Sequence, residues 1–191
     1  VEEYKSNLYR NSYREFVLKS LMDTILNKKL ISEFYQSNKK NFKLRESLYR
    51  IRLIGFPLDN VDRNEIMNRF RRFESKDIYY LDSLSFQFSS YFLADTIWLN
   101  KFDVFEKVSF LNNENVDYYL KKQNYFEVKD SLDLYLFQVI QRLGQNEIAP
   151  LPYVENTIKN IVFNKKKIDF IKDLDNGILK DAIKTKKFET Y

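Results

Sequence analysis

The stretch from Pro150 to Ala182 constrains the fold more than any other part of this chain. Its apolar residues recur at steps of three and four, which places them on one face of a long helix: Val154, Ile158, Ile161, Val162, Ile168, Ile171, Leu174 and Ile178. Pro150 and Pro152 stand at its start, where a missing backbone N–H does no harm. We expect Asn176-Gly177 to interrupt or kink it. A helix with so wide an apolar face needs a covering partner.

The expected partner is a helix at the other end of the chain, over residues 1–25. It carries a largely aromatic stripe at helical spacing: Tyr4, Leu8, Tyr9, Tyr13, Phe16, Val17, Leu21 and Ile25. Such a stripe could be a peptide-binding face, but more often it is core, and we interpret it as core that packs on the final helix. A short second helix follows, and the side chain of Asn27 is suited to cap its first free backbone N–H.

The middle of the chain has a different pattern. Residues 47–56 read as a buried strand ended by Gly55 and Pro57, followed by helices over 64–73, with Asp59 or Asn60 as cap, and over 75–92. A short strand at 96–99, a helix at 102–111, and a hairpin of strands at 125–128 and 134–140 complete it. The fold class predicted is α+β. Residues 1–43 and 150–191 form a helical unit, and residues 44–149 form an inserted α+β domain.

Composition excludes several classes of chemistry. The chain has no Cys and no His, so Cys/His zinc sites, Ser-His-Asp triads and Cys-His pairs are all excluded. With three Gly residues it lacks a phosphate-binding loop, and we expect no metal and no cofactor. These absences favour a binding protein over an enzyme.

The charge is mildly basic, at +5. Acidic residues are interspersed along the chain, and the basic run at 165–167 is best interpreted as the solvated face of the last helix. A nucleic-acid-binding domain is a weaker alternative, because the aromatic residues follow core spacing rather than alternating with Lys and Arg. Neither a membrane span nor a signal peptide is present, and the chain opens at Val1 inside a helical pattern, as a trimmed chain would.

Four stretches together resemble the parvulin-type (PpiC-like) peptidyl-prolyl isomerases and their SurA-like periplasmic chaperone relatives, in particular divergent Bacteroidetes-type members. Residues 31–35 with Lys39 and Phe42 are similar to the helix that precedes parvulin domains, and residues 50–54 to their first strand. Residues 134–139 are similar to the last strand, and residues 150–167 to the closing chaperone helix. The resemblance implies a helical chaperone module, built from both chain ends, with a parvulin-like domain inserted.

The chain departs from the family at its active site. Parvulins use one His on the first strand and one on the last, and here those positions fall near Arg52 and on Tyr135. The Gly-rich segment before the family's Trp-Phe pair is replaced by residues 94–97, which leaves Trp98 as the match, while Phe105 and Phe110 match apolar positions of the proline pocket. The candidate peptide or proline pocket is therefore Arg52, Trp98, Phe105, Phe110 and Tyr135. Core packing is the alternative for Trp98, Phe105 and Phe110, and a surface position for Arg52 and Tyr135.

The function that the resemblance implies is a SurA-like chaperone or foldase for unfolded secreted or outer-membrane polypeptides, located in the periplasm, with an inactive parvulin-like domain. Membrane anchoring through a segment outside this chain is compatible with it. The alternative is a divergent prolyl isomerase that stabilises the twisted amide through donors such as Arg52 and Tyr135. Convergence of the five pocket residues on one open site would favour the enzyme.

Overall fold

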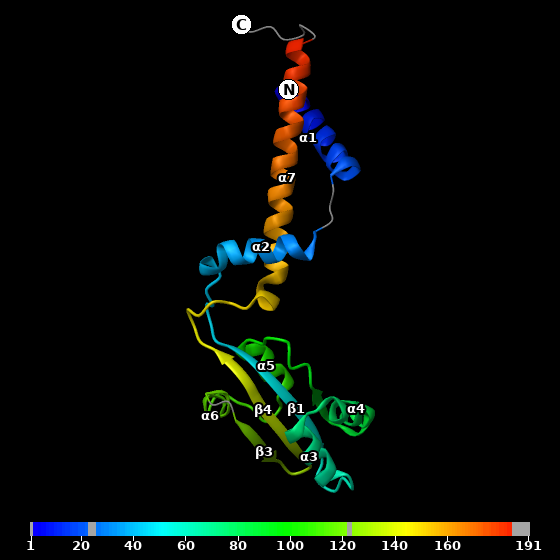
Figure 1. The fold of residues 1–191 in the computed structure, drawn as a ribbon, viewed down its shortest axis with the longest axis vertical. Coiled ribbons are helices and arrows are strands. Elements are labelled where there is room, and N and C mark those ends of the chain that lie inside the picture. Colours follow the sequence, from blue (N-terminus) through cyan, green and yellow to red (C-terminus); the bar gives the residue numbers. More distant parts are fainter. Residues whose placement is uncertain (1, 23–25, 122–123, 185–191) are drawn as a thin grey trace. The chain divides into compact units, whose positions relative to one another are not determined.

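The computed structural model describes residues 2–22, 26–121 and 124–184, and it has a mixed α+β fold (Figure 1). The chain divides into two compact units. The helical unit comprises Val1–Lys39 with Val154–Tyr191, and the sheet unit comprises Lys40–Tyr153. These limits are four residues from those expected at each junction, and the assignment of the units as a chaperone module and a parvulin-like insert stays a prediction.

The helical unit contains α1 (Glu2–Leu21), α2 (Lys28–Asn38) and most of α7 (Leu151–Lys184). Asn27 caps α2 as predicted, since its side-chain oxygen accepts from the Lys29 N–H at 2.9 Å. The predicted break at Asn176-Gly177 is wrong, because α7 continues through both residues. A single helical Gly costs only about 1 kcal/mol, too little to end a helix of 34 residues.

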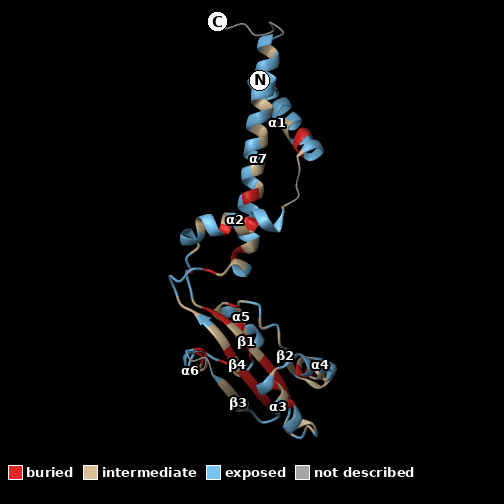
Figure 2. Cartoon of the chain, in the orientation of Figure 1, coloured by how far each residue is buried: buried red, intermediate tan, exposed pale blue. Residues whose placement is uncertain are grey.

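Burial in the helical unit is concentrated where α2 crosses the first turns of α7 (Figure 2). Ile31 and Tyr35 are buried on α2, and Val154, Ile158 and Val162 are buried on α7. The pKa of the Glu155 carboxyl on α7 is lowered chiefly by its hydrogen bond and charge interaction with Lys159, and to a smaller extent by the charge of Lys28 at the start of α2. This crossing is the core of the unit.

The packing of α1 differs from the expectation. Among its described side chains the buried ones are Val17 and Leu18. The rest of the predicted core stripe is more than half exposed, namely Tyr4, Leu8, Tyr9, Tyr13, Phe16 and Leu21, while Ile25 lies outside the described residues. Burial on the described part of α1 is therefore limited to two residues near its end, and interpreting the whole stripe as core was wrong.

The sheet unit is built on four antiparallel strands, β1 (Leu48–Pro57), β2 (Ser90–Phe92), β3 (Tyr125–Lys129) and β4 (Asp133–Leu143), in the order β2-β1-β4-β3. The predicted β3–β4 hairpin is confirmed. Its turn is closed by the Asp130 carboxylate, which accepts from the backbone N–H groups of Leu132 at 2.8 Å and Asp133 at 2.7 Å.

Helices cover both faces of this sheet (Figure 1). On one face Leu53 and Phe137 pack with α5 (Lys101–Lys107) and α6 (Val116–Leu120). On the other face Ile54 and Leu136 pack with α3 (Arg63–Arg72) and α4 (Ser75–Ser83). Alternate residues of β1 and β4 therefore serve two cores, which is why both strands contain consecutive apolar residues, such as 53–54 and 136–137.

Several predicted boundaries in this unit are wrong. The helix expected over 75–92 ends at Ser83, passes through a 3₁₀ turn at Ser85–Gln87, and continues as β2, because pairing with β1 overrides the local periodicity. The strand expected at 96–99 is a single bridge between Tyr49 and Leu99. Gly55 lies inside β1 rather than at its end, and the residue that precedes α3 is Asp62.

The corner between α3 and α4 is held by a fully buried carboxylate, Asp77. Arg72 donates two hydrogen bonds to the Asp77 carboxylate, at 2.8 and 2.5 Å, and the Nη1 of Arg69 donates a third at 3.3 Å. The backbone N–H of Glu74 donates to the same carboxylate at 3.0 Å. The hydrogen bond from Arg72 holds the pKa of Asp77 well below its ordinary value. A buried carboxylate with every oxygen partnered is stable only while it is charged.

We expect Asp77→Asn to lower the unfolding temperature by several degrees, because it leaves Arg72 and Arg69 facing a neutral amide. A depressed folded-state pKa contributes stability above the unfolded value of about 4, and that contribution is lost as the pH falls. The difference between wild type and variant in urea unfolding is therefore constant from about pH 5 to 7 and shrinks below about pH 4. Asp117→Asn, which removes only exposed ion pairs, is the control; an equal effect of both changes contradicts the role of Asp77.

Candidate functional site

The five sequence-predicted pocket residues lie in the sheet unit, but the structure separates Arg52 from Phe105, Phe110 and Tyr135. In the β1–β4 register, Arg52 is opposite Gln138 and its neighbour Leu53 is opposite Phe137. Since Leu53 and Phe137 face α5 and α6, Arg52 points to the other side of the sheet.

Arg52 is already engaged on that side. Its Nη2 donates to the Asp95 carboxylate at 2.9 Å, and its guanidinium carbon lies 3.4 Å from the centre of the Phe73 ring. Arg50 donates to the backbone oxygen of Asp95, and its guanidinium lies 5.7 Å from the ring of Trp98. Two of the five candidates, Arg52 and Trp98, therefore belong to one cluster that is centred on Arg50 and Asp95.

Tyr135, Phe105 and Phe110 gather on the opposite face. Tyr135 and Phe110 have ring centroids 5.3 Å apart, and Phe105 packs on the same apolar core. Tyr135 is only 6% exposed. The pKa of its hydroxyl is raised, since burial and a hydrogen bond with Asp130 outweigh the larger single effect of a hydrogen bond with Ser109.

Gly55 explains how the Tyr135 ring fits against β1. The two residues are directly opposite in the register, and a Cβ added to Gly55 would meet ring carbons of Tyr135 at 2.8 Å. The Tyr135 ring occupies the space that a side chain at position 55 would fill. This close packing gives Tyr135 a structural role, and the five candidates do not converge on one open site.

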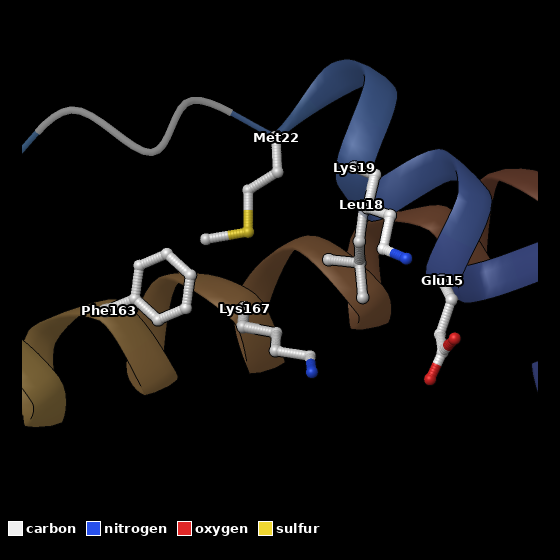
Figure 3. A pocket seen from close by; sticks show the side chains of 6 residues that line it. All are labelled: Glu15, Leu18, Lys19, Met22, Phe163 and Lys167. Atoms are coloured by element: carbon white, nitrogen blue, oxygen red, sulfur yellow. The ribbon is translucent and has the colours of Figure 1, made fainter.

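A surface pocket with several apolar lining residues lies in the helical unit, between α1 and α7 (Figure 3). It has a volume of about 290 Å³. Leu18 and Met22 of α1 and Phe163 of α7 form its apolar lining, and the Met22 side chain runs toward the Phe163 ring. Its remaining lining residues are charged: Glu15, Lys19 and Lys167. We call it the Met22 pocket.

A second pocket of about 490 Å³ lies further along the same two helices. Its lining comprises Arg10, Tyr13, Arg14, Asp175, Ile178, Leu179 and Ala182. Arg14 also joins α1 to α7 here, since its Nη2 lies 2.5 Å and its Nε 3.3 Å from the oxygens of Asp175. We call this the Tyr13 pocket, and the two pockets share an antiparallel seam.

The seam is bordered by apolar side chains that have no cover within the described residues. On α1 these include Tyr13, which lines the Tyr13 pocket and is 53% exposed. On α7, Ile168, Ile178, Leu179 and Ile183 are each about half exposed. Contiguous exposed apolar surface with a polar rim is typical of protein-binding sites. A peptide-binding face was the alternative interpretation of the α1 stripe in the sequence, where core packing was preferred.

The part of the chain that the structure describes contains no cluster of acidic side chains able to hold a metal ion. None of its helices combines the length and the apolar character needed to cross a membrane.

No protein-family model and no curated protein matches the sequence. One solved structure is similar over the whole of this chain and 72% of its own, with 13% identity and a TM-score of 0.37. It comes from work describing the virulence factor PEB4 and the periplasmic protein Cj1289 of Campylobacter jejuni as structurally related SurA-like chaperones. A likeness this weak carries no conclusion about the function of this chain.

The seam yields a test of the α1–α7 pairing. We expect Arg14→Glu and Asp175→Lys each to weaken protection of α1 amides from hydrogen exchange, because each leaves like charges facing one another. The double change restores the pair with reversed sign. Both side chains are partly exposed, so the coupling free energy should be about 1 kcal/mol at low salt. Additive effects of the two single changes would show that the contact does not hold α1.

Proposed function

We propose that this protein is a chaperone-type binding protein that holds apolar segments of non-native polypeptides on the seam between α1 and α7. The observation that carries the proposal is the Met22 pocket, which combines three apolar lining side chains with three charged ones on a helix that exposes large aromatic side chains to water. Exposed apolar side chains that gather around a pocket are typical of surfaces that bind another molecule.

The chemistry of the pocket suits varied apolar clients. Met22 has an unbranched, polarisable side chain that adapts to different partners, and Phe163 offers a rigid ring beside it. A volume of about 290 Å³ accommodates one or two side chains rather than a folded domain. Binding of this kind is a sum of weak contacts and needs no nucleotide or metal.

The finer assignment extends the same proposal. We infer a SurA-like chaperone of the periplasm, with unfolded secreted or outer-membrane polypeptides as clients and the sheet unit as a degenerate parvulin-like domain. The resemblance noted in the sequence supports this assignment. The replacement of both family histidines supports the loss of isomerase chemistry.

The isomerase alternative has less support from the geometry. Arg52 and Tyr135, the two proposed donors, lie on opposite faces of the sheet, and Tyr135 is 6% exposed. A twisted proline amide held by one of them would not reach the other.

We expect the intact chain to leave the cis–trans rate of a proline-containing test peptide at its uncatalysed value, because no described pocket presents both donors to a substrate. A protease-coupled assay measures this. Acceleration well above background that disappears in Tyr135→Phe would replace the proposal with the enzyme.

The binding proposal predicts that Phe163→Ala and Met22→Ser each weaken binding of an unfolded outer-membrane protein by about 5- to 30-fold, as loss of a buried apolar contact at an interface does. Suppression of client aggregation and fluorescence anisotropy provide the readouts. Tyr79→Ala removes an equally conspicuous aromatic side chain, 80% exposed, from the sheet unit and is the matched control. If Tyr79→Ala is as harmful as Phe163→Ala, or if neither matters, the seam is not the client site.

A further inference from the structure

The Met22 pocket carries a charge pattern that its apolar lining does not require. Lys19 comes from α1 and Lys167 from α7, while Glu15 is the acidic lining residue. Two positive charges against one negative charge leave the lining with a net charge of +1. All three side chains belong to residues exposed to water.

The charges further along the seam do not offset this surplus. Arg14 and Asp175 neutralise each other through their two hydrogen bonds. Arg10 donates a hydrogen bond of 2.5 Å to the Asn7 side chain. Since that amide is neutral, it does not offset the positive charge of Arg10. Along the seam the lining residues of both pockets therefore carry Arg10, Arg14, Lys19 and Lys167 against Glu15 and Asp175, a net of +2.

We propose that the Met22 pocket selects client segments in which an apolar side chain is flanked by Asp or Glu. This inference rests on the proposed function and names the class of segment that the site takes. The apolar side chain enters between Met22 and Phe163. The neighbouring carboxylates of the client lie against Lys19 and Lys167, which come from the two walls of the pocket.

The physical basis is charge complementarity at the edge of an apolar site. Each lysine–carboxylate pair is exposed to water and contributes modestly, so the selectivity is a matter of preference rather than of exclusion. Two such pairs correspond to a preference of about threefold to tenfold for acidic over neutral flanks. Basic flanks meet two ammonium groups and should bind more weakly than neutral ones.

The test uses the intact chain and three fluorescent peptides of equal length. They share a central Leu-Phe pair and differ only in flanking residues, which are Glu, Ser or Lys. We expect affinities in the order Glu, Ser, Lys at low salt, and convergence of the three at an ionic strength of about 0.5 M, where such pairs are screened.

Charge reversal identifies the residues responsible. K19E combined with K167E should invert the order of the three peptides, whereas K5E, on α1 but outside both pocket linings, should preserve it. Circular dichroism of each variant checks that the helices are intact.

The remaining outcomes separate the two proposals. Equal affinity for all three peptides, lost in Phe163→Ala, overturns the charge preference and leaves the chaperone function standing. No binding of any peptide overturns both. Peptide affinity that falls as protein concentration rises would show that a second copy of the chain fills the pocket, and this would also overturn the inference.

Discussion

The sheet unit depends on the pairing of β1 with β4, two strands about eighty residues apart in the chain. Their register runs from Leu48 opposite Leu143 to Pro57 opposite Asp133, with an irregularity between Arg50 and Ile51. Because helices cover both faces, each strand contributes alternate side chains to two cores. Closing so long a loop is costly and slow, and burial on both faces compensates for it. The same alternation separates Arg52 from Tyr135 and thereby removes the predicted pocket.

The two units differ in where their large apolar side chains are buried. In the sheet unit, Phe56, Phe70 and Phe137 are completely buried. In the helical unit, burial is concentrated near the α2–α7 crossing, and the seam beyond it retains exposed aromatic and aliphatic side chains. Each large apolar side chain left in water forgoes about 1.5–3 kcal/mol of stabilisation. A surface of this kind is expected where binding of a partner restores that free energy, and the charged residues of the Met22 pocket then decide which partners are preferred.

The sequence predicted secondary structure correctly where one hydrophobic pattern was long and no distant strand competed for the same residues. The final helix, the first strand, the β3–β4 hairpin and the Asn27 cap follow from periodicity and turn chemistry that act locally. Prediction failed at residues 90–92, where helical spacing continued but β1 offered an edge to pair with. It failed again at Gly55, whose role is to make room for a ring eighty residues away. No local signal distinguishes such a glycine from one that ends a strand.

The sequence by itself determined that the chain ends are helical and amphipathic, that the middle is α+β, and that histidine and cysteine chemistry is absent. Periodicity does this because it reports which residues share a face of an element. Only the tertiary structure decided which of those faces are covered. Leu18 is buried and Phe16 is not. Leu18 stands one turn beyond Arg14, which contacts Asp175 of α7, whereas Phe16 is two residues from Arg14 and lies on the opposite face of α1. Periodicity shows that a helix or strand has an apolar face. Whether that face is exposed to water depends on the elements that pack against it in the tertiary structure.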